Sequence, residues 1–167
     1  AYSAIANGGY LLKPRIIKQI MDHDGNIVYS EEGDAIRQVA NKETMEKVRD
    51  MLRGVIANGT GNNADIKGWK IAGKTGTAQK SIKGVYSKKK VNTFVAILPT
   101  SKPKYVLIVL LDEPKPNKEY VYYYKDGSGW KYKGTPYNTA GWTSVEVTGK
   151  IIEKIGPILA TKYVEVN

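Results

Sequence analysis

The chain has 167 residues, of which 41% are hydrophobic and 25% are charged, and this composition indicates one globular domain with a hydrophobic core. It contains no cysteine, which excludes disulfides and thiolate chemistry. With a single histidine, His23, we expect neither a Ser-His-Asp triad nor a multi-histidine metal site. We expect neither a metal nor another cofactor.

The formal net charge of +10 comes from one segment. Residues 66–111 contain ten lysines and no acidic residue, whereas the rest of the chain balances 16 basic against 16 acidic residues. Such a segment favours an anionic partner, which could be nucleic acid, phosphate, a membrane surface or a carboxylate-bearing substrate. A solvated, lysine-rich surface is the alternative explanation for most of these lysines.

The N-terminal third is predicted to contain two helices with a hairpin between them. A short helix over residues 1–7 ends at a glycine pair, and β-branched runs at 15–21 and 26–29 flank Asp24-Gly25, a turn pair typical of hairpins. A second helix begins after Asn41 and ends at Asn58-Gly59. Its apolar face is formed by residues at spacings of three and four: Met45, Val48, Met51, Leu52, Val55 and Ile56.

Three strands are expected after a loop at 59–63. They cover residues 69–79, 91–98 and 105–111, and the short polar turns between them predict an antiparallel meander. Residues 106–111 are apolar on both faces, which predicts a central strand covered on both sides, whereas the lysine-bearing first strand fits a sheet edge.

The C-terminal part is predicted to form a second hairpin and a last helix. Residues 120–137 hold six of the twelve tyrosines around a turn at 126–129. Thr143 and Glu146 have the spacing of a capping box, which opens a helix that we expect Pro157 to interrupt.

Two segments match known ligand-binding motifs in all or part of their sequence, but their predicted surroundings or remaining positions do not fit those motifs. Residues 68–75 fit the phosphate-loop pattern GxxxxGK(S/T), yet residues 69–72 alternate like a strand and residues 75–79 are a poor helix start. Asp22, Asp24 and Asn26 begin like a calcium loop, but Ile27 stands where that loop requires glycine. We assign neither nucleotide nor calcium binding.

The third motif, Lys74-Thr75-Gly76-Thr77, can bind a carboxylate and stabilise an oxyanion. Lysine and threonine hold a carboxylate by charge-assisted hydrogen bonds, and an edge-strand N–H can donate to a tetrahedral oxyanion. Gly76 allows a substrate backbone to approach closely. A polar, glycine-containing edge strand is the structural alternative.

Several ordered segments around this motif resemble the transpeptidase domain of class B penicillin-binding proteins, and the layout is most similar to the division-type, septal members. Residues 1–9 look like the family's helix and turn, residues 12–17 and 24–25 like its hairpin, and residues 48–61 like its helix and GT-containing loop. Residues 72–79 are similar to its KTG strand, and residues 109–114 to its buried strand.

The resemblance implies an α+β fold in which helices cover both faces of a five-stranded antiparallel sheet, with this chain supplying the later strands and the C-terminal helix. It also implies peptidoglycan D,D-transpeptidation, in which a serine is acylated by the D-Ala-D-Ala end of a stem peptide or by a β-lactam. Lys74 would place positive charge beside the serine. Thr75 and Thr77 would bind the substrate carboxylate, the Thr77 N–H would donate to the oxyanion, and Gly76 would permit close approach.

The serine itself is expected outside these residues. SxN does not occur, and SxxK occurs three times, starting at Ser87, Ser101 and Ser128, in what we expect to be turns. Chance alone predicts about one match in a chain with this many serines and lysines. We therefore expect residues 1–167 to be the C-terminal portion of one transpeptidase domain, inactive alone, with the nucleophile upstream of Ala1.

The family's short exit after the buried strand is replaced here by the tyrosine-rich residues 120–137, which we interpret as a flap for glycan or a partner, or as a plain surface hairpin. The resemblance further implies stem peptides and β-lactams as ligands, cell-wall synthesis or division proteins as partners, an inner-membrane anchor upstream and a periplasmic location. Two other functions stay open: a non-catalytic sensor or scaffold of the same fold, and a basic nucleic-acid module.

Overall fold

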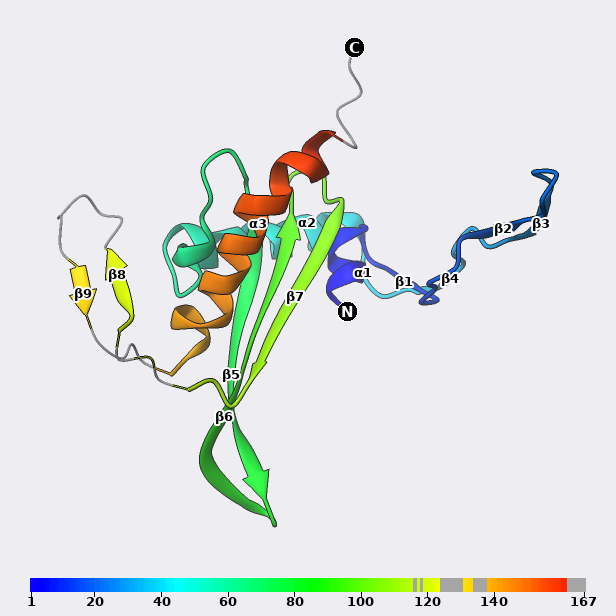
Figure 1. Cartoon of the computed structure of the whole chain (residues 1–167). Coiled ribbons are helices and arrows are strands. Elements are labelled where there is room, and N and C mark those ends of the chain that lie inside the picture. Colours follow the sequence, from blue (N-terminus) through cyan, green and yellow to red (C-terminus); the bar gives the residue numbers. More distant parts are fainter. Residues whose placement is uncertain (116, 118, 124–130, 134–137, 162–167) are drawn as a thin grey trace.

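A three-stranded antiparallel sheet forms the centre of the molecule in the computed structural model, which describes residues 1–115, 117, 119–123, 131–133 and 138–161 (Figure 1). Its strands are β5 (Ala72–Ile82), β6 (Val85–Leu98) and β7 (Tyr105–Asp112), in that order. The predicted meander is confirmed.

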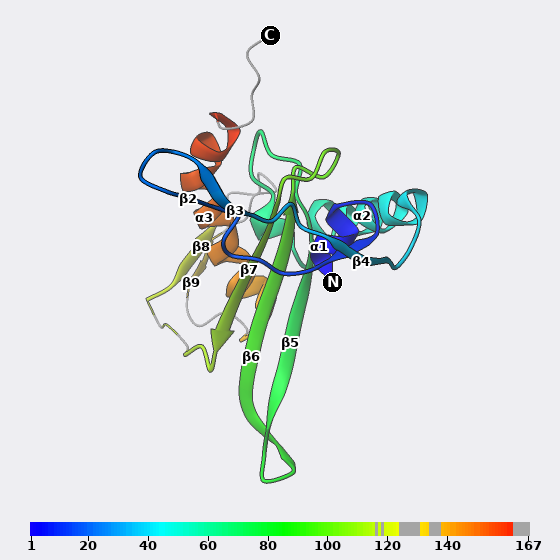
Figure 2. The same ribbon diagram turned by 90° about the vertical axis from the view of Figure 1, so that its right-hand side faces the viewer.

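Helices cover both faces of this sheet, as the α+β prediction required. The long helix α3 (Ser144–Thr161) packs on one face, α1 (Tyr2–Ala6) lies on the other, and α2 (Lys42–Ala57) packs along the edge strand β5 (Figures 1 and 2). β6 is buried on both of its faces. Phe94 joins the core beneath α3, and Ile97 is buried on the opposite face. The core beneath α3 consists of Ile56, Ala64, Ile71, Phe94, Ala96, Leu98, Val145 and Ile152.

The hairpin between β5 and β6 is longer than predicted. The strands continue to a two-residue turn at Lys83-Gly84, where both residues have positive φ, as tight hairpin turns require. Lys88, Lys89 and Lys90 therefore lie in β6, and our placement of these lysines, and of the SxxK match at Ser87, in a turn was wrong. Both faces of this end of the hairpin are largely exposed, so lysine is tolerated in a regular strand.

The prediction that residues 106–111 form a central, fully covered strand was also wrong for the described residues. β7 lies at the sheet edge, where Ile108 and Leu110 are 60% and 58% exposed. β5 occupies the opposite edge, as its lysines indicated. Apolar periodicity shows what a strand can bury, and within the described residues this face of β7 is only partly covered.

Helix α2 begins where the sequence predicted. The side chain of Asn41 accepts a hydrogen bond from the Thr44 N–H at 2.8 Å and caps the helix. Met45 and Ile56 are buried, but Met51 is 66% exposed, and Arg49 is buried in its place with Nη1 donating to the Ile5 carbonyl at 3.1 Å. The helix therefore turns a charged residue toward α1, which a hydrophobic pattern does not reveal.

Between α1 and α2 the chain forms an arm that extends away from the sheet (Figure 1). β1 (Tyr10–Leu12) pairs with β4 (Ala35–Gln38), and beyond them β2 (Gln19–Met21) pairs with β3 (Ile27–Ser30). The predicted hairpin around Asp24-Gly25 is confirmed. Asp22 accepts from the backbone N–H groups of Asp24 and Asn26, so these polar residues form a turn.

The C-terminal part contains β8 (Val121–Tyr123), which pairs with β9 (Lys131–Lys133), and this confirms a second hairpin. Its predicted turn at 126–129 lies outside the described residues, as do most of the predicted flap's aromatic side chains. Helix α3 starts near Thr143, but Thr143 Oγ1 donates to the Thr139 carbonyl instead of capping the helix, so the predicted capping box was wrong.

Pro157 does not interrupt α3, contrary to our expectation. The helix continues to Thr161, because a proline removes a single N–H donor and this last turn is largely exposed. Across the described residues we find no helix with the length and apolarity needed to cross a membrane.

Candidate functional site

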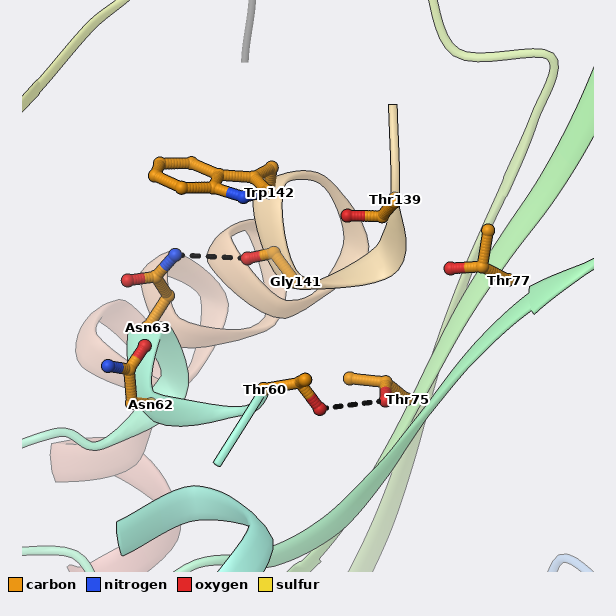
Figure 3. Close-up of a pocket in the computed structure, with 8 residues that line it drawn as sticks. All are labelled: Thr60, Asn62, Asn63, Thr75, Thr77, Thr139, Gly141 and Trp142. Atoms are coloured by element: carbon orange, nitrogen blue, oxygen red, sulfur yellow. Dashed lines mark hydrogen bonds between the residues drawn. The ribbon is translucent and has the colours of Figure 1, made fainter. Parts of the chain in front are cut away.

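Thr75 and Thr77 line a cavity of about 360 Å³ beside β5 (Figure 3). The opposite walls come from two short 3-10 helices, η1 (Asn62–Ala64) and η2 (Ala140–Trp142), and from the residues next to them. The lining residues are Thr60, Asn62, Asn63, Thr75, Thr77, Thr139, Gly141 and Trp142. All are uncharged, so no lining carboxylate repels an anionic ligand.

The two threonines of β5 contact different walls of the cavity. Strand alternation places Thr75 and Thr77 on the same face of β5. The hydroxyl of Thr75 lies 3.0 Å from the hydroxyl of Thr60, and Thr77 Oγ1 accepts a hydrogen bond from the Ala140 N–H at 2.9 Å (Figure 3 shows the first contact). The sheet edge is therefore tied to the loop before it and to η2.

These contacts leave hydroxyl donors available. A threonine hydroxyl carries one O–H donor. The bond between Thr60 and Thr75 uses one of their two O–H groups, and the Thr77 O–H is not used in a hydrogen bond within the described residues. The site thus retains two O–H donors, which suits the two oxygens of a carboxylate.

The other two residues of the predicted motif lie on the opposite face of β5. Lys74 is exposed and its Nζ donates to the Thr75 carbonyl at 2.9 Å, and Lys74 does not line the cavity. Gly76 lies against Thr93 on β6, where an added Cβ would be 2.5 Å from Thr93 Oγ1. The structure therefore brings Thr75 and Thr77 together and places Lys74 across the strand from them.

The loop that carries Thr60 is fixed by an arginine of α2. The Arg53 guanidinium donates to Asp65 at 2.8 Å and to the Ile71 carbonyl at 3.1 Å, which joins the helix, the loop and the start of β5. Gly61 sits where an added Cβ would be 2.6 Å from Ile56 Cδ1. Close packing at Gly61 therefore holds Thr60 against the strand.

An ion-pair cluster lies further along the hairpin. Lys80 Nζ contacts Asp112 at 3.0 Å and Glu113 at 2.8 Å, and Lys89 contacts Glu113 at 3.0 Å. The hydrogen bonds from Lys80 and then Lys89 hold the pKa of Glu113 below its ordinary value, and those from Glu113 and Asp112 raise the pKa of Lys80. The cluster joins β5, β6 and the end of β7 at the base of the projecting hairpin.

The walls contributed by Thr139, Gly141 and Trp142 were missed by sequence reasoning. They reach the cavity from more than 60 positions beyond Thr77, and the signal available was only the expectation that the tyrosine-rich residues 120–137 replace the family's short exit. The GT-containing loop was noted, but Thr60, Asn62 and Asn63 were not assigned to the site. Among the described residues there is no group of three or more His, Asp or Glu side chains arranged to hold a metal ion.

Comparison with known proteins decides the family. A family model described as the penicillin binding protein transpeptidase domain matches residues 1–131. The chain belongs to the penicillin-binding protein transpeptidase family. Stage V sporulation protein D of Bacillus subtilis is 38% identical over 117 residues, which cover 69% of this chain and 18% of that protein. A peptidoglycan D,D-transpeptidase FtsI homolog of Mesostigma viride is 35% identical over 127 residues, 68% of this chain and 21% of that protein.

A solved penicillin-binding protein shares the fold. Penicillin binding protein 3 from Mycobacterium tuberculosis, described as complexed with aztreonam, superimposes with a TM-score of 0.70 at 32% identity, over 93% of this chain and 34% of that one. The predicted penicillin-binding fold is confirmed. The chain spans about a fifth of the length of the two curated relatives.

Proposed function

We propose that this chain supplies the carboxylate-binding strand of a peptidoglycan D,D-transpeptidase that acts in cell-wall synthesis and cell division and binds β-lactams. One observation carries the proposal: Thr75 and Thr77 of the KTGT strand share an uncharged cavity in which two O–H donors are available. The names of the FtsI homolog and of the aztreonam complex support the substrate and the drug class.

Each residue of the motif has a proposed part in the reaction. A serine Oγ attacks the carbonyl between the two D-alanines, the terminal D-alanine leaves, and an amine of a second stem peptide takes the acyl group from the serine ester. Thr75 and Thr77 hold the terminal carboxylate, and the Thr77 N–H donates to the tetrahedral oxyanion. Lys74 places positive charge beside the serine, and Gly76 permits close approach.

The serine is proposed to lie in another part of the protein, of which residues 1–167 are the C-terminal portion of one transpeptidase domain. The edge position of β7 supports further strands beside it, and its exposed Ile108 and Leu110 support further chain packed on that face. Two of the SxxK matches support it as well, since Ser87 lies in β6 and Ser101 in the turn after it, and neither opens a helix. The third, at Ser128, lies outside the described residues.

Location and partners follow from the substrate. Peptidoglycan lies outside the inner membrane, so we place this domain on the periplasmic side, held by a membrane anchor elsewhere in the protein. Cell-division or other wall-synthesis proteins are its proposed partners. The tyrosine-rich segment 120–137 stays a predicted flap for glycan or a partner.

Replacing Lys74 tests the enzyme function directly. In the full-length protein, Lys74→Ala should slow both D-alanine release from a D-Ala-D-Ala peptide and acylation by a penicillin by about a hundredfold, because a charge beside the reacting serine is lost. The exposed lysine adds little to the core, so the unfolding temperature should stay unchanged. Lys102→Ala, which removes an exposed lysine in the turn after β6, is the charge-matched control.

Wild-type rates in Lys74→Ala would refute the proposed electrostatic role of Lys74. A wild-type protein with neither activity would favour the non-catalytic scaffold.

A further inference from the structure

The wall of the cavity that faces Thr77 is held by polar contacts. The Ala140 N–H donates to Thr77 Oγ1 at 2.9 Å, and Asn63 Nδ2 donates to the Gly141 carbonyl at 3.0 Å (Figure 3 shows the second contact). The position of this wall decides whether one lone pair of Thr77 Oγ1 is occupied, and with it the direction in which the Thr77 O–H can point.

A buried asparagine lies directly behind this wall. Asn92 on β6 is the register partner of Thr77 and is fully buried. Its amide nitrogen donates to Asn138 Oδ1 and to Thr143 Oγ1, both at 2.9 Å. Asn138 precedes the η2 wall and Thr143 follows it, so a single side chain holds both ends of the wall.

The network has one consistent direction of donation. Asn138 Nδ2 donates to the Pro114 carbonyl at 3.0 Å, so its Oδ1 faces Asn92 as an acceptor. Thr143 Oγ1 uses its hydrogen toward the Thr139 carbonyl at 2.9 Å, so it too can only accept from Asn92. Both contacts of Asn92 therefore require its NH₂ group, and an acceptor in that place would break them.

Asn138 also closes the neck of the segment that contains the tyrosine-rich hairpin. Its bond to the Pro114 carbonyl joins the two ends of residues 115–137, and its own carbonyl accepts from Lys90 Nζ at 3.0 Å.

The amide at position 92 is costly for the core. Within the described residues the side-chain oxygen of Asn92 is buried and accepts no hydrogen bond, and Phe94, two residues along the same face, is a core residue. A buried acceptor without a partner is destabilising, and an apolar residue would avoid that loss. The two hydrogen bonds that Asn92 donates are therefore the contribution that sets an asparagine here apart from an apolar residue.

We propose that Asn92 is a positioning residue for carboxylate recognition, an inference that rests on the proposed transpeptidase function. By fixing Asn138 and Thr143 it keeps the Ala140 N–H on Thr77 Oγ1, and this contact aims the Thr77 O–H into the cavity. Asn92 does not line the cavity and acts through the wall.

The experiment compares Asn92→Leu with wild type in the full-length protein, using a penicillin and its methyl ester. Leucine removes the unpartnered oxygen of Asn92 and adds apolar contacts, which offsets the loss of the two donated bonds, so the unfolding temperature should change little. Acylation by the penicillin should fall about tenfold while acylation by the ester changes by less than about twofold, because only the carboxylate uses the Thr77 O–H. Thr100→Val is the control, since it removes the hydrogen bond of another buried side chain, to the Lys70 carbonyl, away from the wall.

Thr143→Val provides a second variant if leucine overpacks position 92, and it should produce the same selective loss. A loss that is equal for the acid and the ester, or no loss, in a variant that folds would overturn the role of Asn92 while leaving the transpeptidase function intact. A wild-type protein that no penicillin acylates would instead remove the proposed function, and this inference with it.

Discussion

At the scale of single residues, the site depends on hydroxyl groups whose hydrogen bonds are partly committed. Thr60 shares one hydrogen with Thr75, and Ala140 occupies one lone pair of Thr77. Hydroxyls that are fixed on one side lose less freedom when a carboxylate arrives, which favours binding. The lysine of the motif is different, because Lys74 is exposed and contacts only a neighbouring carbonyl among the described residues. Its proposed contribution is electrostatic.

Gly73, at the start of the motif strand, offers a test of packing. An added Cβ would be 2.6 Å from both Phe94 Cζ and the Val95 carbonyl, and a backbone atom cannot move aside cheaply. Gly73→Ala should destabilise the full-length protein by about 1–3 kcal/mol through overpacking. Gly54→Ala is the matched control, since nothing lies within 4 Å of its added Cβ inside α2, and it should stabilise by about 1 kcal/mol through helix propensity. Thermal unfolding measures both, and a Gly73→Ala protein as stable as wild type would contradict the tight fit.

At the scale of elements, the hairpin of β5 and β6 is anchored by charges whose protonation can be followed. The pKa of Glu113 is lowered by Lys80 and Lys89, so its stabilising effect is present above the ordinary glutamate pKa of about 4.3 and is lost as pH falls through the lower folded value. The raised pKa of Lys80 works in the other direction, and its contribution is lost only as pH rises above the usual lysine range.

We therefore expect the protection factors of the amide protons at the base of the hairpin, which compare the intrinsic with the observed exchange rate at each pH, to fall in acid, below about pH 4, and less so in Glu113→Gln, which lacks the titrating group. Hydrogen exchange of β5 and β6 amides across pH measures this. A Glu113 carboxyl that titrates at or above the ordinary value would show that the ion pairs do not form in solution.

The elements that were predicted correctly are those with local signals. The α2 boundaries follow from Asn41 and Asn58-Gly59, and the strands from their β-branched residues. The errors arise where long-range contacts override local ones. Arg49 is buried and donates a hydrogen bond to the Ile5 carbonyl. The Thr143 hydroxyl does not cap α3, because it accepts from Asn92 and donates to the Thr139 carbonyl. Spacing within one segment does not reveal such partners.

At the scale of the whole molecule, only two of the eight residues that line the cavity could be assigned to the site from sequence. The KTGT motif and its resemblance led to Thr75 and Thr77, which do share a cavity. The opposite wall, with Thr139 and Trp142, could not be found, because it depends on how the chain returns from β7 to the far edge of the sheet.

The measurement that tests the central claim most directly is the intact mass of the full-length protein and of the isolated 167-residue chain, each before and after incubation with a penicillin. If this chain supplies the carboxylate-binding strand of an acylating enzyme whose serine lies elsewhere, the full-length protein gains one drug mass and the isolated chain gains none. An adduct on the isolated chain would place the nucleophile within these residues, and a full-length protein without an adduct would contradict the proposed transpeptidase.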